Sequence, residues 1–310
     1  MKVLSLFDGI SCGQLALNGG GIVVDKYYAS EIESNAIAIT NYNYPNTVHL
    51  GDITKITEKQ LDTLGHIDLI IGGSPCQDLS CFKQNTHENI GLDGDKSKLF
   101  YHYLRILRYV NPKYFLLENV ASMTDKDRDI ITELLGVEPI MINSSLVVPQ
   151  ERKRYYWCNF PITQPISTNP KITDIILEPE TIPSKYWYNR DFVYNGDDKR
   201  IQCTLQGTGL LNNMRMVFNV NGTCNTLLCD GDGGNRVKKV YQDGRCRKFT
   251  PLEYERLQSL PDNYTQYGIK DGKVVKISDS KRYTTVGNGW TVDIITHIFK
   301  CLKDYDNKTK

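Results

Sequence analysis

Short apolar runs alternate with amphipathic segments through the first half of the 310-residue chain. The apolar runs predict strands over residues 2–7, 25–30, 47–50, 67–72, 113–118 and 139–144. Apolar positions at helical spacing predict helices over 13–20, 34–44 and 96–110. Such alternation is typical of a parallel sheet covered on both faces, so we expect an α/β fold that binds ligands at the carboxyl ends of its strands.

The pattern changes after about residue 160, where five prolines between positions 161 and 183 interrupt regular helix. Residues 200–245 are rich in glycine and asparagine, which predicts a second, smaller domain of strands and loops. Helical patterns return at 250–260 and 291–302, and the last predicts a helix packed on the first domain. We therefore expect a first domain over 1–160, a second over 161–270, and a return to the first over 271–310.

The composition is typical of a packed globular protein, with 40% hydrophobic and 24% charged residues. The 37 Lys and Arg residues nearly balance 36 Asp and Glu residues, so a polyanion would have to bind a local basic face. No apolar run approaches the roughly 18 residues of a membrane span. The first run reaches Asp8 too early for a signal peptide, so we expect a cytoplasmic protein. The nine cysteines lack the paired spacing of a zinc site, so we expect reduced thiols and no metal.

Residues suited to ligand binding follow the first three predicted strands. In the segment LFDGISCGQLAL, Gly9 and Gly13 would let the backbone approach a ligand closely. Asp8 would repel a pyrophosphate, which argues against a nicotinamide dinucleotide and for a cofactor with a cationic group. Glu31 after the second strand suits ribose hydroxyls, and Asp52 after the third suits an adenine amino group. Each acidic residue taken alone is also compatible with a helix cap.

A cysteine follows the fourth predicted strand in the segment GSPCQDLS, where Pro75 makes the turn before Cys76 rigid. Most lone cysteines are packing residues. However, Glu118 lies at the end of the fifth predicted strand, at the same edge of the sheet, and a thiol facing an acid suits covalent catalysis. The long polar segment 77–98 predicts a mobile lid over these groups.

Basic residues occur in two further places. The segment QERKR puts Gln150, Arg152 and Arg154 on one face of an extended chain, where two guanidinium groups suit a phosphate or a carbonyl oxygen. A later cluster consists of Lys238, Lys239, Arg245, Arg247 and Lys248. These cations suit phosphate contacts, although a solvated protein face explains them equally well.

Six segments in this order resemble the DNA (cytosine-5) methyltransferases across nearly the whole chain. They are LFDGISCG, SPCQ, ENV, QERKR, RKFTPLEYERLQSLPDNYT and VGNGWTVDII. SLFDGI, ASE, GSPCQDLS and Trp290 also resemble the vertebrate de novo DNA methyltransferases, whereas Asn288 and RKFTPLEYERLQSLPD are similar to bacterial restriction-modification and phage enzymes. We expect a compact prokaryotic or phage enzyme.

The resemblance implies a Rossmann-like sheet for S-adenosylmethionine-dependent methyl transfer and a smaller target-recognition domain. It implies methylation of C5 of cytosine in duplex DNA, with the base flipped out of the stack. Cys76 would attack C6, Glu118 would bind N3 and the exocyclic amine, and Arg154 would hold the base O2. Arg152 would support the adduct or the adjacent phosphate.

The resemblance also implies two sets of binding residues. The set for S-adenosylmethionine and its product S-adenosylhomocysteine is Phe7, Asp8, Gly9, Ile10, Ser11, Gly13, Glu31, Ile32, Asp52, Ile53, Ser74, Pro75, Leu99, Asn288, Gly289 and Trp290. The set for DNA is Gln77, Ser80, Gln150, Gln206, Asn212, Asn213, Arg215, Thr226 and Arg236, with Asn235 as a further candidate. Thr226-Leu227 matches a Thr-Leu pair of the family's small domain, and 206–215 lies where the family carries a DNA-reading loop, although a solvated hairpin tip explains that stretch too.

Alternative functions remain open at this point. A tRNA cytosine-5 methyltransferase would share the catalytic segments, but its Cys-Phe-Thr tripeptide does not occur in the small domain. A non-catalytic DNA-binding relative would lack the nucleophile, which is present here as Cys76. We expect double-stranded DNA as partner, a monomer on DNA, association with the nucleoid, and a functional link to a restriction endonuclease.

Overall fold

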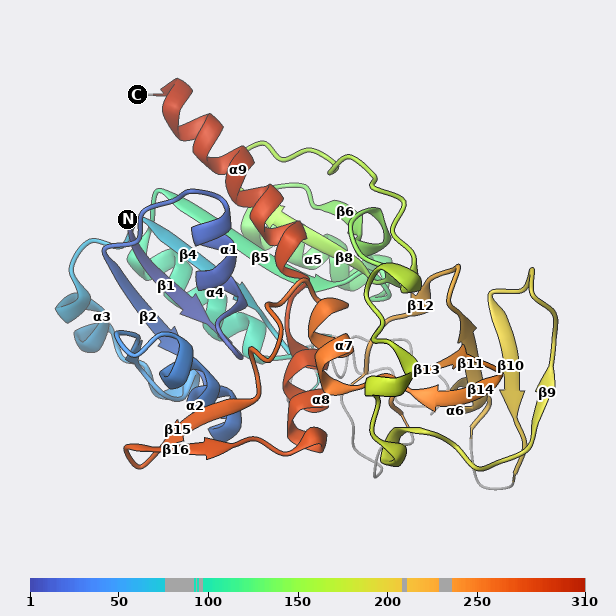
Figure 1. Ribbon diagram of the computed structural model, residues 1–310. Helices are drawn as coiled ribbons and strands as arrows, with labels where there is room; N and C mark the ends of the chain where they lie inside the picture. The colour runs from blue at the N-terminus through green and yellow to red at the C-terminus, as the bar shows by residue number, and fades with distance from the viewer. Residues whose placement is uncertain (76–91, 93, 95–96, 208–210, 229–235, 310) are drawn as a thin grey trace. The chain divides into compact units, whose positions relative to one another are not determined.

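The computed structural model describes residues 1–75, 92, 94, 97–207, 211–228 and 236–309 (Figure 1). The chain forms two compact units. Unit 1 comprises Met1–Ile142, Lys153–Gln164 and Ile294–Lys310, and unit 2 comprises Asn143–Arg152 and Pro165–Asp293. Cys76 lies outside the described residues. Most of the expected lid segment 77–98 lies outside them as well.

Unit 1 contains a seven-stranded sheet in the order β3-β2-β1-β4-β5-β8-β6. The strands are β1 Lys2–Leu6, β2 Lys26–Ser30, β3 Val48–His49, β4 Leu69–Gly73, β5 Tyr114–Val120, β6 Ile140–Asn143 and β8 Lys153–Cys158. The pairs from β3 to β5 are all parallel. The strand order reverses at β1, and the carboxyl ends of strands at such a switch point are the usual ligand site.

The predicted α/β class and the six predicted strands of the first half are confirmed. The expectation of a parallel sheet was wrong for β8, which pairs antiparallel with β5. The run KRYYWC begins with charged residues, so its first half does not show the apolar pattern of a buried strand. Helices α3 and α5 were also not predicted.

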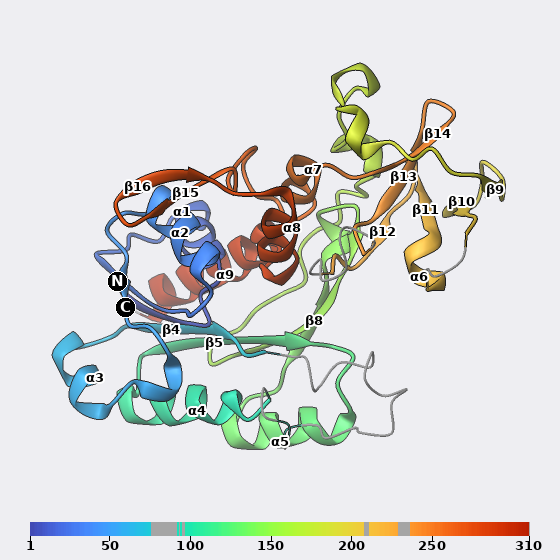
Figure 2. The same ribbon diagram turned by 90° about the horizontal axis from the view of Figure 1, so that it is seen from below.

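Helices cover both faces of this sheet (Figure 2). They are α1 Cys12–Gly19, α2 Ser34–Asn43, α3 Glu58–Leu64, α4 Leu99–Val110, α5 Asp125–Leu135 and α9 Val292–Thr309. Helices α3, α4 and α5 lie on one face, and α1 and α9 on the other. The apolar spacing of α9 therefore predicted correctly that this helix packs on the first domain.

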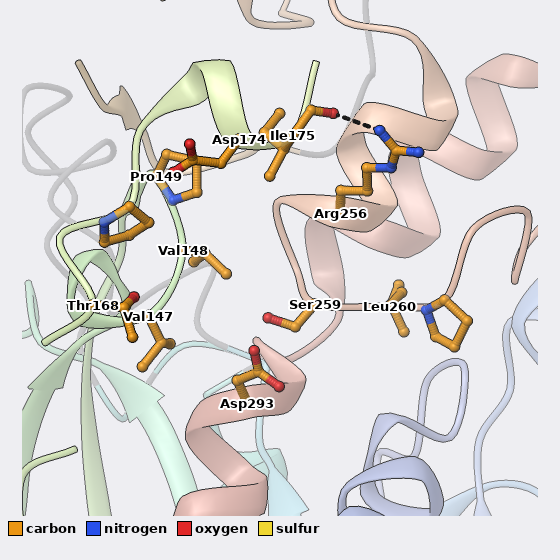
Figure 3. A pocket seen from close by; sticks show the side chains of 12 residues that line it. Val147, Val148, Pro149, Thr168, Asp174, Ile175, Arg256, Ser259, Leu260 and Asp293 are labelled. Atoms are coloured by element: carbon orange, nitrogen blue, oxygen red, sulfur yellow. Dashed lines mark hydrogen bonds between the residues drawn. The ribbon is translucent and has the colours of Figure 1, made fainter. Parts of the chain in front are cut away.

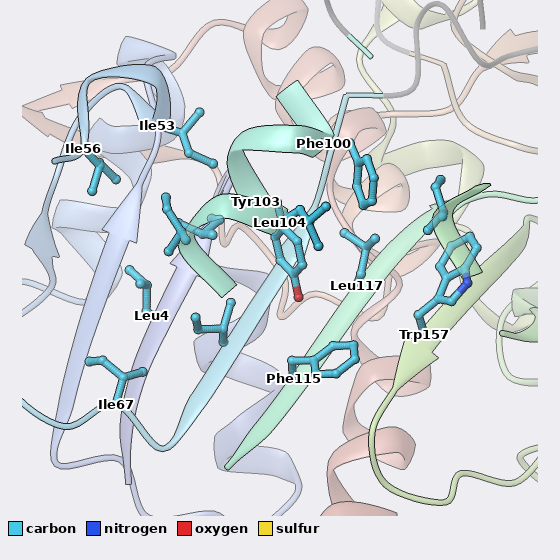
Figure 4. Packing of buried hydrophobic residues seen from close by; sticks show 14 of the residues in the cluster. Leu4, Ile53, Ile56, Ile67, Phe100, Tyr103, Leu104, Phe115, Leu117 and Trp157 are labelled. Atoms are coloured by element: carbon cyan, nitrogen blue, oxygen red, sulfur yellow. The ribbon is translucent and has the colours of Figure 1, made fainter. Parts of the chain in front are cut away.

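The main core lies between the sheet and the face of α3, α4 and α5 (Figure 4). Phe100 and Tyr103 of α4 are fully buried against strand residues such as Leu117, and Trp157 of β8 closes one end. Gly72 of β4 has to be glycine, because a Cβ there would lie 2.8 Å from Leu6 O and 3.0 Å from the Tyr103 ring. The close approach of β1, β4 and α4 thus depends on a missing side chain.

Unit 2 is built around a five-stranded sheet in the order β14-β13-β11-β10-β9. Its strands are β9 Phe192–Tyr194, β10 Ile201–Leu205, β11 Met216–Asn219, β13 Lys239–Gln242 and β14 Arg245–Lys248. Cys203, Leu205, Val217 and Cys246 form its core. Burial raises the pKa of the Cys246 thiol to about 12, so this thiol is protonated at neutral pH.

Smaller elements complete unit 2. They are the pair β7 Gln150–Glu151 with β12 Cys224–Asn225, the hairpin β15 Tyr267–Lys270 with β16 Lys273–Lys276, and helices α6 Asn212–Arg215, α7 Pro251–Arg256 and α8 Asp279–Asn288. Short 3-10 turns occur at Ile53–Lys55 in unit 1 and at Ser144–Leu146, Ile172–Asp174, Pro179–Thr181 and Ser184–Tyr186 in unit 2. Pro251 at the first turn of α7 and a Thr250–Glu253 capping box explain why α7 begins there.

The bounds of the units differ from the expected boundaries at 160 and 270. Residues 143–152 belong to unit 2 because β7 pairs with β12. Unit 2 also extends to Asp293, because Tyr254 of α7 packs edge-on against Tyr283 of α8 with ring centroids 4.7 Å apart. Only the last helix returns to unit 1.

An ion pair between Arg247 and Glu253 is fully buried in unit 2. The two guanidinium nitrogens donate to the two carboxylate oxygens at 2.7 and 2.8 Å. Glu253 also accepts from Thr250 N and Leu177 N at 2.6 and 2.9 Å. Arg247 therefore holds the strand β14 to helix α7. The suggestion that Arg247 contacts phosphate was wrong, because its guanidinium is not at the surface.

Replacement of Arg247 by Met leaves the Glu253 carboxylate buried and unpaired. We expect Arg247→Met to lower the free energy of unfolding by about 3–5 kcal/mol. Arg245→Met is the matched control on the same strand, because the Arg245 side chain is 55% exposed. The control should cost at most about 1 kcal/mol. Urea unfolding of both variants checks this, and equal costs would show that the buried pair has no special role.

Candidate active site

The loop after β1 has an unusual backbone. Phe7, Gly9 and Ser11 all have left-handed φ values, of 61°, 60° and 59°. Two of these three residues are not glycine, so surrounding contacts have to hold the conformation. A Cβ built on Gly9 has no neighbour within 4 Å, so this part of the loop faces open space.

Glu31 holds this loop from the end of β2. Its Oε2 accepts from Gly9 N at 2.8 Å, and its Oε1 accepts from Ile32 N at 2.7 Å and Glu33 N at 2.8 Å. A carboxylate has about four lone-pair sites, so one remains for a ribose hydroxyl. The neighbouring Ile32 side chain is 73% exposed and offers an apolar surface beside that carboxylate.

The Asp8 carboxylate lies in a cluster of hydroxyl groups beside the loop. Tyr27 Oη donates to its Oδ1 at 2.7 Å, and Ser11 Oγ donates to its Oδ2. Burial raises the pKa of Asp8 to about 6, although hydrogen bonds from Ser11, Ser5 and Tyr27 lower it. The structure therefore makes Asp8 a residue that positions the loop, and its carboxylate is already engaged.

Asp52 follows β3 and caps the turn at Ile53–Lys55. Its Oδ1 accepts from Thr54 N at 2.9 Å and from Thr54 Oγ1 at 2.8 Å, and these bonds lower the pKa of Asp52. Ile53 is buried in the main core. Asp52 thus has the capping role that was open at the sequence level, and Oδ2 lies beside the exposed Lys55 at 3.9 Å.

The other candidate cofactor residues of unit 1 are divided between the loop and the strand ends. Ile10, Ser11 and Gly13 are buried behind the loop, Phe7 and Pro75 are half-buried, and Leu99 begins α4. Ser74 is buried after β4, and its Oγ accepts from Asn119 Nδ2 at 2.9 Å. In unit 2, Asn288 is exposed, Gly289 buried and Trp290 half-buried.

Glu118 lies on β5 directly beside the end of β4. It pairs with Gly73, so the chain that leads to Cys76 departs next to this carboxylate. Arg154 Nε lies 2.8 Å from Glu118 Oε1, and both side chains are about nine-tenths buried, at 12% and 10% exposed. The antiparallel β5–β8 pairing brings them together. Cys76 itself lies outside the described residues.

Gln150 and Arg152, which the sequence is expected to place on one face with Arg154, are both hydrogen-bonded inside unit 2. Both belong to unit 2, whereas Arg154 belongs to unit 1. Arg152 donates to Gly287 O at 3.4 Å and Gly289 O at 3.0 Å. Gln150 is fully buried, with both its amide nitrogen and its carbonyl oxygen hydrogen-bonded inside unit 2.

The candidate DNA-reading residues differ in exposure. Gln206, Asn212 and Arg236 are exposed, and Asn213 is half-buried. Arg215 Nε donates to Leu205 O at 2.8 Å, and Thr226 Oγ1 donates to Glu151 O at 2.7 Å. Gln77, Ser80 and Asn235 lie outside the described residues.

An open pocket of about 630 Å³ also lies within unit 2 (Figure 3). Val148, Pro149 and Leu260 supply apolar walls, and Arg256 in the pocket donates to Ile175 O at 3.1 Å. None of the candidate cofactor or DNA residues lines it. Among the described residues there is neither a cluster of three metal-ligating side chains nor a helix long and apolar enough to cross a membrane.

A family model described as C-5 cytosine-specific DNA methylase matches residues 1–304. The chain belongs to this family. It is therefore an S-adenosylmethionine-dependent enzyme that methylates C5 of cytosine in DNA, which confirms the resemblance and the predicted activity.

Relatives of this methylase include restriction-modification enzymes. It is 28% identical over 333 residues to the Type II methyltransferase M1.ScrFI of Lactococcus lactis subsp. cremoris, covering 100% of this chain and 79% of the relative. It is 23% identical over 324 residues to M.HhaI of Haemophilus parahaemolyticus, covering 96% and 93%. The fold is similar to that of S. pombe Dnmt2, with a TM-score of 0.71, 20% identity and 99% of each chain covered. It is also similar to that of a putative E. coli prophage DNA modification methyltransferase, with a TM-score of 0.70, 19% identity and 99% of each chain covered.

The raised pKa of Asp8 predicts a pH dependence of stability. An unfolded Asp has a pKa of about 3.9, and the folded value is about 6, so between these values the folded protein binds more protons. The stability contributed by Asp8 is therefore present at low pH and falls as the pH rises from about 4 to about 6. We expect the free energy of unfolding of the parent, relative to Asp8→Asn, to decline over that window.

Urea unfolding of both proteins at several pH values between 4 and 7 measures this difference. Asn can still accept from Tyr27, so the loop is disturbed little by the substitution. A difference that rises with pH would mean that Asp8 is stabilised as the anion, contrary to its burial.

Proposed function

We propose that this methylase acts on cytosine in duplex DNA through a covalent bond between Cys76 Sγ and C6 of a flipped-out base. The observation that carries the proposal is the Glu118–Arg154 pair beside the end of β4, where the chain continues towards Cys76. A base has to leave the stack because its C5 and C6 are otherwise inaccessible.

The roles of the side chains follow from the electron flow. Attack of the Cys76 thiolate on C6 forms the S–C6 bond and moves negative charge onto the ring. Glu118 binds N3 and the exocyclic amine, where this charge develops. Arg154 bonds Glu118 through Nε and donates to Lys153 O through Nη1 at 2.8 Å, so the base O2 would accept from the guanidinium donors that these two bonds leave. S-adenosylmethionine, when bound, supplies the methyl group to C5. Loss of the C5 proton and expulsion of Cys76 restore the ring.

Arg152 has a different place in this proposal. Its bonds to Gly287 O and Gly289 O hold the chain that leads to Asn288 and Trp290. We assign to its guanidinium the support of the adduct or of the adjacent phosphate.

The groups after β1, β2 and β3 suit the cofactor. Glu31 keeps acceptor capacity for one ribose hydroxyl, and the space beside Gly9 admits a ligand close to the backbone. Ile32 is available to one adenine face, and Phe7 to the adenine or methionine part. Asp52 is assigned to the adenine amino group, and Asn288 and Trp290 complete the set. Asp8 acts through the loop.

The proposed biological setting is that of a prokaryotic or phage enzyme. We propose that it acts as a monomer on duplex DNA in the cytoplasm, associated with the nucleoid, and that it has a functional link to a restriction endonuclease. The relatives M1.ScrFI, M.HpaII and M.HhaI support this setting, because each of them is a Type II methyltransferase of a bacterium.

Cys76→Ser should abolish methylation, because a hydroxyl is a far weaker nucleophile than a thiolate. Cys301→Ser is the control, since Cys301 lies on α9 and contacts His297 and Thr163. Duplex DNA with 5-fluorocytosine at the target should be trapped by the parent and by the control, because fluorine does not leave as a proton does. Denaturing gels with S-adenosylmethionine present measure the trapped complex.

Turnover by Cys76→Ser near the parent level would remove Cys76 from the mechanism. Methylation of tRNA with no product on duplex DNA would favour the tRNA methyltransferase instead. Binding of DNA without methyl transfer by the parent would favour a non-catalytic relative.

Flanking sequence should be read by unit 2, chiefly by residues 206–235. We expect Gln206→Ala and Asn212→Ala each to cost about 1–3 kcal/mol of discrimination at one flanking position, because Gln and Asn suit adenine edges. Asn189→Ala is the control, since Asn189 is an exposed residue of unit 2 outside this stretch. Bisulfite sequencing of a host that expresses each variant measures the preference. Unchanged preferences in both test variants would exclude these two residues as readers.

A further inference from the structure

A buried polar network surrounds Gln258, which follows α7 in unit 2. Its side chain is fully buried and makes four hydrogen bonds, the full capacity of an amide. Nε2 donates to Val286 O at 3.1 Å and to Gly289 O at 3.0 Å. Oε1 accepts from Thr291 Oγ1 at 2.7 Å and from Gln150 Nε2 at 3.2 Å.

Gln150 connects this network to the proposed recognition segment. Its Nε2 also donates to Leu257 O at 2.8 Å, and its Oε1 accepts from Leu227 N at 2.9 Å. Leu227 follows Thr226, and the strand pair β7–β12 holds the two chains in register. Two amide side chains in series therefore lead from Leu227 to the end of α8.

Arg152 reaches the same end of α8 by a second route. Its guanidinium donates to Gly289 O at 3.0 Å, so this carbonyl accepts from both Arg152 and Gln258. Thr291 is also tied to Ser144 through their hydroxyls at 3.0 Å. Three segments of separate proposed function thus share one network: 150–152, 226–227 and 286–291.

We propose that Gln258 is a positioning residue that couples recognition of target DNA to binding of the cofactor. This inference rests on the proposed roles of the segments at Thr226 and at Asn288–Trp290. An apolar side chain of similar length would fill the same space. Only a group with two donors and two acceptors matches the two carbonyls of 286 and 289 and the two donors of Gln150 and Thr291.

The coupling follows from the cost of an unpaired buried polar group. A shift of Leu227 moves Gln150, and a shift of Gln150 leaves Gln258 Oε1 with one donor fewer. Because buried groups are expensive to leave unsatisfied, the amide of Gln258 turns with its partner, and the carbonyl of Gly289 follows. Ordering of either segment by its ligand therefore favours the bound arrangement of the other.

The test compares Gln258→Met with Gln202→Met in the full-length protein. Gln202 is the matched control: it is a buried glutamine of unit 2 whose Nε2 donates to Asp197 Oδ1 at 2.8 Å, outside this network. Calorimetry measures the Kd of S-adenosylhomocysteine with and without a duplex that contains the target sequence. The ratio of the two Kd values is the linkage factor. We expect Gln258→Met to lower this factor by about fivefold or more, and Gln202→Met to leave it unchanged.

Linkage is reciprocal, so the effect of S-adenosylhomocysteine on the Kd for DNA should fall by the same factor. A purely structural role would weaken both Kd values and leave the factor as it is, and that result overturns the inference. If Gln258→Met does not fold by circular dichroism, Thr291→Val removes one donor to Gln258 and should lower the factor in the same direction; an unchanged factor there overturns the inference as well.

The parent protein separates this inference from the proposed function. A parent that methylates DNA but shows a factor of one overturns only the coupling. A parent that neither methylates DNA nor forms the Cys76 adduct overturns the proposed function and this inference with it.

Discussion

The carboxylate of Glu31 accepts hydrogen bonds from three backbone amides, and the loop at the proposed cofactor edge of unit 1 depends on it. The loop after β1 contains three residues with left-handed φ values. Two of them, Phe7 and Ser11, have a side chain that disfavours this conformation. Such a backbone persists only where its surroundings determine it. Glu31 fixes the amide of Gly9 from one side, and the Asp8, Ser11 and Tyr27 cluster fixes the loop from the other. Strand order places these groups together, since β1 lies between β2 and β4.

The first half of the fold could be predicted because its strands are apolar on both faces and its turns carry glycine or acidic residues. The pattern of apolar residues failed to predict a strand where charged side chains are buried. Strand β8 starts with Lys153 and Arg154, and the largely buried Arg154 side chain is paired with Glu118 of the neighbouring strand. Its antiparallel direction depends on pairing with a strand more than thirty residues earlier, which no local pattern contains.

Some roles in the candidate site could likewise be predicted from the sequence, and others could not. Glu118 was predicted from its place at the end of a strand, and the structure brings it together with Arg154 at 2.8 Å. The buried roles of Gln150, Asp8 and Arg247 could not be predicted, because a polar residue in a sequence gives no sign of which partner removes it from water. Gln258 was missed for that reason. The only available signal was its position inside RKFTPLEYERLQSLPDNYT, one of the segments that carry the family resemblance.

The thiols in the core of unit 2 have a practical consequence. Cys203, Cys224 and Cys246 are buried, and burial raises the pKa of each thiol. An alkylating reagent reacts with a thiolate, so it reaches these sulfurs only when the strands that carry them open. The rate at which they are labelled under native conditions would therefore report local opening of unit 2 one cysteine at a time, and mass spectrometry of the labelled peptides would map which strands separate first.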